Sequence, residues 1–476
     1  MKEFDLVIIG GGVAGLVAAS GAAQLGARVA IVEKSALGGD CLRYGCVPTK
    51  RLIRSAYVAS LAKRAAEFGV ECHPVKTDFG KVMEGVRKVQ AEIGKKDSPE
   101  RFRQMGVEVV FGDGRFKDPG SFEVDGEVLG ARRFIISTGS SPVLPPIPGL
   151  RESGTLTNET ALELPELPGS LIILGGGPIG IEFAQAFSRL GATVTIIEKS
   201  GGILPREDPE VSGALREMLE AEGIGINTSA EVKEVKRDGG KKLVIVSGPH
   251  GERSYLADEI MTAIGRAPNV EGLALERAGV QYDGKKGITT DETLRTTGKR
   301  IYACGDVAGR FAFTHTAEHE SGVALSNSLF PFIRRKADYG AVPWVTYSDP
   351  ELARAGLTEE EAGERYGKKD VRVYRKSFRG IDRAVIDGEA KGLIKVVCRT
   401  SGAILGAHIL GPRAGELIHE YTLAMRKGMH IGEISRTIHV YPTVSEANKR
   451  AADEYYREKL FKGRLPKITS WLIRRF

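Results

Sequence analysis

Two cysteines, Cys41 and Cys46, are separated by four residues within the segment GGDCLRYGCVPTK, which spans residues 38–50. They can close a small disulfide loop if the backbone bends between them, and Gly45 makes that bend easier. Because Pro48 is favoured at the first position of a helix, we expect both thiols at or just before a helix N-terminus. The partial positive charge there lowers a thiol pKa and stabilises the thiolate, which attacks disulfides and binds metal ions.

Two other interpretations of the pair stay open. The cysteines can be small buried apolar side chains. They can also supply half of a zinc site, for which the distant Cys72 and His73 are the candidates for further ligands. The redox interpretation is favoured because the pair directly follows a nucleotide-binding pattern.

That pattern begins with an apolar run at residues 6–9, which leads into glycines at residues 10–15 and then into small helix-forming residues. A second apolar run at residues 28–32 ends in an acid. A strand, a glycine turn, a helix and a strand ending in an acid about 20 residues later are typical of dinucleotide binding. The glycines permit the tight turn, the approach of a pyrophosphate and close helix packing, and the acid binds a ribose. The residues with these roles are Gly10, Gly12, Gly15 and Glu33.

The same pattern recurs at residues 171–198, and its corresponding residues are Gly175, Gly177, Gly180 and Glu198. One glycine pattern alone is weak evidence, but two copies in full context predict two dinucleotide sites. Glu198 is placed to bond a ribose 2′-OH and to repel a 2′-phosphate, so the second site favours NAD over NADP.

The composition limits the class of protein. The chain of 476 residues is too long for one compact domain, and a prior of roughly 100–200 residues per domain suggests about three. A net charge of +7 is small for this length and does not suggest nucleic-acid binding. Acidic residues near Met1 argue against a signal peptide, and no apolar run reaches the roughly 18 residues of a membrane span. We therefore expect a cytoplasmic protein, where a close cysteine pair is more often catalytic than structural.

The rest of the chain predicts further elements. Helices are expected over residues 48–68 and 79–105, a β-rich region over residues 107–136, and a stiff proline connector over residues 142–148. From about residue 341 short strands alternate with helices and no glycine pattern appears. The predicted fold class is α/β, with two Rossmann-like dinucleotide-binding domains and a C-terminal α+β domain.

The chain resembles the pyridine-nucleotide disulfide oxidoreductase family, which includes dihydrolipoamide dehydrogenase, glutathione reductase and mercuric reductase. The segment around Cys41 and Cys46 is highly specific to this family, residues 263–269 and 302–306 support the resemblance, and it covers nearly the whole length. It implies that the first pattern binds FAD, the second binds NAD, and the last domain builds a homodimer. The implied domains are 1–150 (FAD, first part), 151–270 (NAD), 271–341 (FAD and central part), 342–460 (dimerisation) and 461–476 (basic tail).

The resemblance also implies residue roles. Cys46 faces the flavin as the charge-transfer thiolate, Cys41 is the interchange thiol that meets the substrate, and Lys50 pairs with Glu182 beside the flavin. Lys50 can instead be a solvated helix lysine, and Asp306 can simply cap a helix. Further residues implied at FAD are Gly39, Gly114, Thr138, Gly139, Asp306 and Ala317, and those implied at NAD are Gly265 and Arg266. No metal site is predicted.

One position departs from the family pattern. Disulfide-reducing members use a histidine followed shortly by a glutamate to move the proton between thiol and substrate, and this segment completes the partner subunit's site. Glu446 matches the glutamate, but Tyr441 occupies the histidine position. A tyrosine with a pKa near 10 is a poor base at neutral pH. His439 lies two residues earlier and is expected to point elsewhere.

The leading hypothesis is an NADH-dependent FAD enzyme, similar to dihydrolipoamide dehydrogenase, that passes electrons through Cys46 and Cys41 to a small disulfide or lipoyl group. Alternatives are a mercuric-type metal-ion reductase, a flavin-direct quinone or transhydrogenase-type activity, and a flavoprotein subunit that docks on a lipoyl protein or membrane partner. The basic tail, residues 461–476, suggests weak contact with a membrane surface or partner, or simple packing on a subunit.

Overall fold

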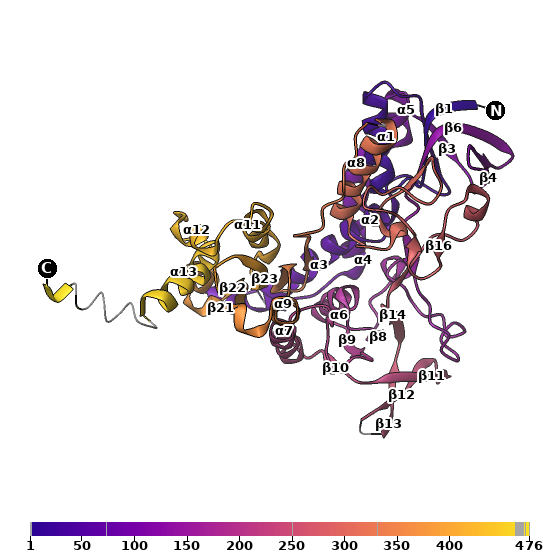
Figure 1. Ribbon diagram of the computed structural model, residues 1–476. Helices are drawn as coiled ribbons and strands as arrows, with labels where there is room; N and C mark the ends of the chain where they lie inside the picture. Colours follow the sequence, from indigo (N-terminus) through magenta and orange to yellow (C-terminus); the bar gives the residue numbers. More distant parts are fainter. Residues whose placement is uncertain are drawn as a thin grey trace. The chain divides into compact units, whose positions relative to one another are not determined.

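The computed structural model of the chain (Figure 1) describes residues 2–72, 74–249, 251–330, 332–461, 471 and 473–475. The chain forms two compact units. The first comprises Met1–Leu171, Glu234–Leu243 and Leu256–Asp338, and the second comprises Ile172–Lys233, Val244–Tyr255 and Tyr339–Phe476. The division into five domains expected from the sequence stays a prediction. The two units reflect contacts within the chain, whereas the expected domains were defined by the nucleotide that each binds.

A seven-stranded sheet forms the centre of the first unit, in the order β3-β2-β1-β6-β5-β4 with β18 beside β6. The pairs β1–β2, β2–β3, β1–β6 and β6–β18 are parallel, whereas β4 and β5 form an antiparallel extension. The strands are β1 (Lys2–Ile9), β2 (Val29–Glu33), β3 (Glu108–Phe111), β4 (Gly114–Asp118), β5 (Ser121–Val124), β6 (Glu127–Ile136) and β18 (Ile301–Ala303). Leu6, Val7 and Ile8 are fully buried, because apolar layers cover both faces of the central strand.

Helices α1 and α8 pack together in the first unit, and the Ser321 hydroxyl donates to the carbonyl of Ala14 at 2.6 Å. The helices of this unit are α1 (Val13–Gln24), α2 (Gly39–Arg43), α3 (Cys46–Lys63), α4 (Phe79–Gly94), α5 (Pro99–Gln104) and α8 (Thr314–Leu329). Smaller elements are η1 (Ala65–Phe68), η2 (Lys95–Asp97), η3 (Thr160–Glu163), η4 (Leu275–Ala278), η5 (Asp306–Ala308), β7 (Ser140–Pro142), β14 (Glu259–Thr262), β15 (Arg266–Pro268), β16 (Tyr282–Asp283) and β17 (Gly287–Ile288).

The helical stretch expected over residues 79–105 is present, but it consists of α4, η2 and α5 with a break at Ser98. Ser98 has an extended backbone (φ −67°, ψ 141°) and its side chain accepts from the N–H of Arg101 at 3.3 Å. A residue before proline is driven out of the helical region, so η2 ends at Asp97 and Pro99 starts α5. The helix expected from residue 48 begins at Cys46 and ends at Lys63.

The second unit contains strands of the second fingerprint and a separate antiparallel sheet. Its strands β9 (Thr193–Ile197) and β10 (Gly225–Asn227) are parallel, with α6 (Pro178–Leu190) and α7 (Pro209–Ala221) in the same unit. The boundary between the units falls at or within β8 (Ser170–Leu174), β11 (Glu231–Asp238), β12 (Lys241–Gly248) and β13 (Gly251–Ala257).

The antiparallel sheet has the order β19-β20-β23-β22-β21 and carries the core of the C-terminal region. Short strands alternate with helices there, as expected from the sequence, and the predicted α/β class is confirmed. The elements are β19 (Pro343–Thr346), β20 (Glu351–Gly356), α9 (Glu359–Tyr366), η6 (Lys368–Asp370), β21 (Val371–Ser377), η7 (Phe378–Gly380), α10 (Asp382–Ile386), β22 (Leu393–Arg399), β23 (Ile404–Gly411), α11 (Ala414–Arg426), α12 (Ile431–Arg436) and α13 (Glu446–Phe461).

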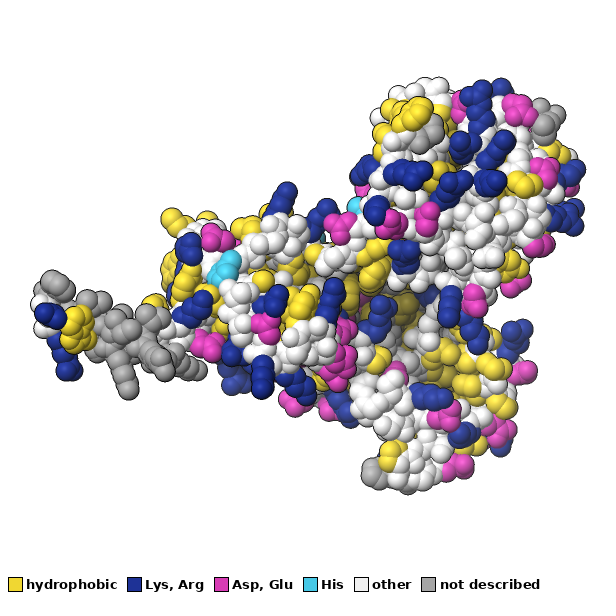
Figure 2. Space-filling view, viewed as in Figure 1, with side chains coloured by type: hydrophobic (Ala, Val, Ile, Leu, Met, Phe, Trp, Pro, Cys, Tyr) yellow, Lys and Arg dark blue, Asp and Glu magenta, His cyan; other side chains and the backbone are white. Residues whose placement is uncertain are grey.

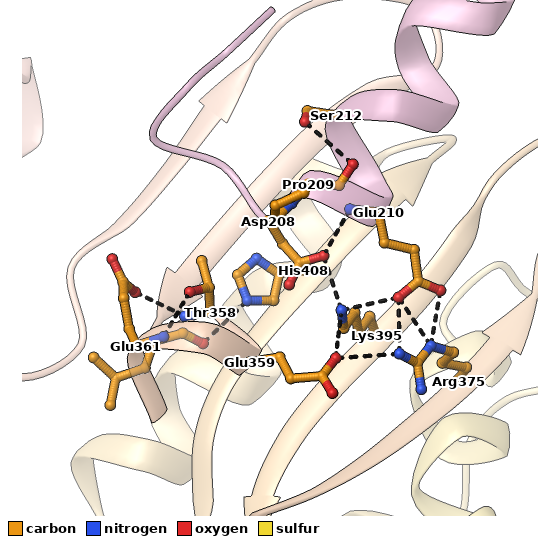
Figure 3. A network of polar contacts seen from close by, with 11 residues as sticks. Asp208, Pro209, Glu210, Ser212, Thr358, Glu359, Glu361, Arg375, Lys395 and His408 are labelled. Atoms are coloured by element: carbon orange, nitrogen blue, oxygen red, sulfur yellow. Dashed lines mark hydrogen bonds and ion pairs between the residues drawn. The ribbon is translucent and has the colours of Figure 1, made fainter. Parts of the chain in front are cut away.

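A buried ion-pair network joins α7 to this sheet within the second unit (Figure 3). Lys395 on β22 lies 2.9 Å from the carboxylates of Asp208, Glu210 and Glu359, and its side chain is 4% exposed. Asp208 also caps α7 by accepting from the N–H of Glu210 at 3.1 Å. The network therefore fixes the start of α7 on the C-terminal sheet.

Candidate active site

The cysteine pair lies in two successive helices of the first unit. Cys41 is in the short α2, and Cys46 is the first residue of α3. The N–H groups of Tyr44 and Gly45 both donate to the carbonyl of Asp40, at 2.8 and 2.7 Å, which bends the chain between the two thiols. A Cβ added at Gly45 would lie 3.1 Å from that carbonyl oxygen, so the bend favours glycine. The expected bend and helix start are both present.

The two thiols contact each other and a third residue. The Cys41 side chain hydrogen-bonds to Cys46, and this bond, together with burial, raises the pKa of Cys41. This differs from the lowered thiol pKa expected at a helix N-terminus, because Cys41 precedes that helix, is half-buried and hydrogen-bonds to Cys46. Thr314, the first residue of α8, hydrogen-bonds to Cys41 and lies 3.5 Å from Cys46, hydroxyl oxygen to Sγ. Cys46 is exposed and Cys41 is half-buried.

The other cysteines take no part in this pair. Cys304 and Cys398 are buried in apolar clusters, and Cys72 is exposed. Among the described residues, no three or more His, Cys, Asp or Glu side chains gather in a way that could hold a metal ion. His73, the other ligand considered for zinc, lies outside the described residues.

The first fingerprint forms a tight turn between β1 and α1. Gly10 has φ +108°, and a Cβ there would lie 2.4 Å from the carbonyl oxygen of Ser137. A Cβ at Gly15 would lie 1.9 Å from the Gly10 carbonyl oxygen, so internal packing requires glycine at both positions. Glu33 accepts from the N–H of Gly11 at 2.7 Å, which holds the acid beside the turn.

The middle glycine of this turn is different. A Cβ at Gly12 would have its nearest described neighbour, the Cα of Gly39, at 3.9 Å. Internal packing therefore does not require glycine there, whereas close approach of a ligand does. The open face of Gly12 at the N-terminus of α1 fits the pyrophosphate of a dinucleotide.

A polar chain links Asp306, which was expected at FAD, to Arg266 and to the segment that carries Cys41. Asp306 accepts from the Ser140 hydroxyl at 2.6 Å, and Ser140 accepts from Nε of Arg266 at 2.8 Å. Arg266 also donates to Asp40, which precedes Cys41, at 2.9 Å. Burial raises the pKa of Asp306. The structure thus places Arg266, expected at NAD, with Asp306 in the first unit.

The other residues expected at FAD are distributed along the same unit. Thr138 donates to the carbonyl of Asn269 at 2.7 Å, and Gly139 accepts from the N–H of Asn269 at 2.9 Å. Gly114 starts β4 against Phe122, and the N–H of Ala317 donates to the carbonyl of Phe313 at 2.9 Å in the first turn of α8. Gly39 opens α2 with φ +58°.

The second fingerprint repeats the first in detail. Gly175 has φ +108°, and a Cβ at Gly180 would lie 2.0 Å from its carbonyl oxygen. Gly177 has no described atom within 4 Å of such a Cβ, so its face is open as at Gly12. Glu198, 9% exposed, accepts from the N–H of Gly176 at 2.6 Å. Gly265 lies in the first unit with φ +133°.

The predicted pairing of Lys50 with Glu182 stays a prediction, because the two residues belong to different units. Lys50 lies in α3, where its Nζ is 3.4 Å from the Thr49 hydroxyl. Glu182 is buried in α6 and accepts from the N–H of Tyr347 at 2.9 Å.

The C-terminal dyad positions lie in the second unit. Tyr441 is 65% exposed and donates to Asp382 at 3.0 Å, which raises the tyrosine pKa. Glu446 is buried at the start of α13, with Arg450 at 3.5 Å. His439 lies 3.0 Å from Glu420 through Nε2 and 3.0 Å from the Thr437 carbonyl through Nδ1. Both ring nitrogens of His439 are therefore engaged away from Tyr441.

Sequence reasoning missed Thr314, Ser140 and Asp40. Asp40 is adjacent to Cys41 and Ser140 is adjacent to Gly139, so their positions beside expected site residues were the available signal. Thr314 stands three residues before Ala317, but nothing local indicates that it reaches the cysteines.

No helix within the described part of the chain is long and apolar enough to span a bilayer. Most of the predicted basic tail lies outside the described residues, including Lys462, Arg464 and Lys467.

Comparisons with known proteins agree with this geometry. The chain is 38% identical over 474 residues to a dihydrolipoyl dehydrogenase of Thermus scotoductus, covering 97% of this chain and 99% of the relative. It is 34% identical over 452 residues to a mercuric reductase of Staphylococcus aureus, covering 94% and 82%. The solved Cu(II) complex of the HOCl-induced flavoprotein disulfide reductase RclA from Escherichia coli matches with a TM-score of 0.86 and 29% identity, covering 95% of this chain and 100% of that one.

Two family models account for most of the chain. Residues 4–321 match the pyridine nucleotide-disulphide oxidoreductase model, and residues 342–452 match the dimerisation domain of the same family. Members of this family bind FAD and NAD(P) and act on a sulfur group or a metal ion. With its cysteine pair and two dinucleotide fingerprints, the chain belongs to the pyridine nucleotide-disulphide oxidoreductase family.

Proposed function

We propose that the protein is an NADH-dependent, FAD-containing disulfide oxidoreductase, similar to dihydrolipoamide dehydrogenase, with Cys41 and Cys46 as its redox centre. The observation that carries the proposal is the contact between the two thiols at the start of α3, in the same unit as the first fingerprint. A disulfide between them is the electron acceptor inside the enzyme, and the thiols are the donor to the substrate.

The residues of the first unit fit FAD. Gly10, Gly12, Gly15 and the α1 N-terminus would hold the pyrophosphate, Glu33 the adenosine ribose, and Asp306 a hydroxyl of the flavin side chain. Gly39, Gly114, Thr138, Gly139 and Ala317 would line it, and Lys50 would stabilise negative charge beside the ring. Bound FAD supplies the two-electron link between a nicotinamide and a disulfide.

The protein residues handle the sulfur chemistry. Two electrons from NADH cleave the Cys41–Cys46 disulfide to two thiols. Cys41 then loses its proton and attacks the substrate disulfide, and the substrate thiolate that is expelled takes up that proton. Cys46 attacks the mixed disulfide in the same way, which re-forms the Cys41–Cys46 disulfide and releases the second substrate thiol. The overall reaction converts NADH, a proton and one disulfide into NAD⁺ and two thiols. Thr314 hydrogen-bonds to Cys41, which favours its thiolate during the exchange.

The preference for NADH rests on Glu198. Its carboxylate is held at the second fingerprint by the N–H of Gly176. A 2′-phosphate beside this carboxylate would be repelled, whereas a ribose hydroxyl can donate to it. Gly175, Gly177 and Gly180 would hold the pyrophosphate of NAD.

We also propose a homodimer formed through the C-terminal sheet. The match to a dimerisation domain supports it. So does the apolar surface around Tyr441, where Ile438 is 95% exposed and Val440 is 73% exposed. In such a dimer Tyr441 and Glu446 would complete the partner subunit's site.

A second candidate function is reduction of a thiophilic metal ion. It is favoured by Tyr441, whose raised pKa makes it a poor proton acceptor, and by His439, which is bound to Glu420. Reduction of a metal ion held by thiolates does not need a protein acid–base group to protonate a leaving thiolate. The identity to a mercuric reductase is consistent with this candidate.

An anaerobic titration of the holoenzyme with NADH tests the redox pair. We expect a long-wavelength charge-transfer band after two electrons, and its loss in Cys46→Ala with FAD still bound. Absence of the band in the unaltered enzyme would contradict the proposal, as would full activity without both cysteines, which would favour direct transfer from flavin to a quinone or dye. A steady-state screen of lipoamide, glutathione disulfide, Hg(II) and quinones then separates the acceptors.

A further inference from the structure

The loop that follows α8 presents apolar side chains which the redox chemistry does not use. Phe332 is 99% exposed, Phe330 is 42% exposed and Ile333 is 43% exposed. Single exposed apolar residues are ordinary, but three aromatic or aliphatic side chains close together in one loop mark a contact surface. The first unit does not cover this surface with its own described residues.

The backbone holds this loop in a defined shape. Asn327, which is 6% exposed, donates to the carbonyls of Arg335 and Thr293 at 2.8 and 2.9 Å, and accepts from the N–H of Arg335 at 2.9 Å. The N–H of Ile333 donates to the carbonyl of Phe330 at 2.9 Å, which closes a turn. A buried side chain therefore anchors the Arg335 end of the loop to α8.

Positive charge follows directly on the apolar tip. Arg334, Arg335 and Lys336 are consecutive, are all exposed, and have no acidic residue between them and Phe330. Lys336 pairs with Glu292, so part of this charge is compensated within the unit. The two arginines leave a net positive surface beside the aromatic tip.

A further apolar side chain lies at the same end of the unit. Leu25, 59% exposed, ends α1, and α1 approaches the last turns of α8 where Gly21 faces Leu325. In Figure 2 the top of the view carries hydrophobic, Lys and Arg side chains with some Asp and Glu side chains among them. Within the loop itself the apolar and cationic residues follow one another directly in the sequence.

We propose that this loop, defined by Phe330, Phe332, Ile333, Arg334, Arg335 and Lys336, docks on the surface of an anionic lipid bilayer. A fully exposed aromatic ring enters the boundary between headgroups and acyl chains, while adjacent cations attract anionic headgroups. Phe332 is almost fully exposed, so its ring is free to enter a soft medium such as the headgroup region. We expect the protein to bind the bilayer reversibly, because one aromatic side chain and a few cations anchor it only weakly.

This site is separate from the basic C-terminal tail. The test is co-sedimentation of the holoenzyme with vesicles of phosphatidylcholine alone and of phosphatidylcholine mixed with phosphatidylglycerol. We expect binding to the anionic vesicles only, reduced about tenfold or more in Phe332→Ser and about fivefold in Arg334→Gln. Phe68→Ser is the matched control, since Phe68 is 48% exposed in another part of the unit, and it should bind like the unaltered protein.

Two further variants test whether Phe332 itself enters the bilayer and whether the C-terminal tail is responsible for binding. Phe332→Trp should show a blue-shifted emission with anionic vesicles beyond any change that Trp344 and Trp471 give in the parent protein. A chain that ends at Phe461 should keep the sensitivity to Phe332→Ser. Binding that is lost with the tail and unaffected by Phe332→Ser would overturn the proposal. Absence of any vesicle binding would also overturn it and would leave a protein partner as the occupant.

Discussion

The hydroxyl oxygen of Thr314 lies 3.5 Å from Sγ of Cys46, although the two residues are 268 positions apart in the sequence. Thr314 also hydrogen-bonds to Cys41 and favours the thiolate form of that residue. One hydroxyl group at the start of α8 therefore contacts both halves of the proposed redox pair.

Replacing Thr314 with valine should raise the thiol pKa, and so lower the fraction of thiolate, without removing either cysteine. Loss of one hydrogen bond to an anionic sulfur is expected to lower the alkylation rate of the reduced enzyme by about threefold to tenfold at neutral pH. The pH profile of alkylation by iodoacetamide should move to higher pH. Thr314→Ser retains the hydroxyl and should restore the profile, and an unchanged profile in Thr314→Val would show that the contact has no influence on the pair.

Variants of Tyr441 test whether the absence of the family's histidine at this position limits disulfide reduction. Tyr441→His in the dimer should raise the rate of lipoamide reduction by about tenfold or more, because an imidazole exchanges protons at neutral pH. Tyr441→Phe serves as the control and should leave Hg(II) reduction within about twofold of the parent rate. Strong loss of lipoamide activity in Tyr441→Phe would show instead that the tyrosine hydroxyl is itself used for proton transfer.

Cofactor choice depends on Glu198. Glu198→Ala removes the carboxylate that repels a 2′-phosphate, and the ratio of kcat/KM for NADPH to that for NADH should rise about tenfold or more. The ratio is measured on one preparation, so a partial loss of folded enzyme cancels. A parent enzyme that already prefers NADPH would refute the assignment.

The ion-pair network of Figure 3 makes a prediction about stability. Lys395→Met leaves Asp208, which is 1% exposed, without its cation and should cost about 3–5 kcal/mol in chemical unfolding. Asp208→Asn combined with Lys395→Met removes the buried charge but keeps a side chain that caps α7, and should recover much of the loss. Lys391→Met, on an exposed lysine, is the control and should change stability little.

The same network predicts a pH dependence. Hydrogen bonding to Arg375, and then to Lys395, lowers the pKa of Glu210 to about 2. Because the folded pKa is below the unfolded value, this stabilisation is present above about pH 4.5 and is lost as the pH falls toward about 2. Unfolding of Glu210→Gln should therefore differ from the parent at pH 7 and converge with it in acid. A constant difference across that range would exclude the carboxylate as the cause.

The residues that the sequence identified correctly share a physical property, namely that local chain geometry encodes them. The turn at Gly10, the close packing at Gly15 and the bend at Gly45 arise between neighbours in the chain, so glycine spacing alone predicts them. The repeated pattern ending in Glu198 is predictable for the same reason. The split of the helix over residues 79–105 was also encoded locally, by Ser98 before Pro99, but the apolar pattern concealed it.

Tertiary packing decided the rest. Thr314 reaches the cysteines only because α8 starts where α3 starts, and Arg266 reaches Ser140 only because β15 pairs with β7. His439, which lies between α12 and α13, is engaged by Glu420 of α11, and spacing in the sequence cannot predict that contact. The sequence by itself determined the fold class and the two glycine patterns, and it predicted the proposed redox pair, since each depends on contiguous residues. The side chains that surround that pair come from distant segments, and only the packing of helices on the sheet brings them together.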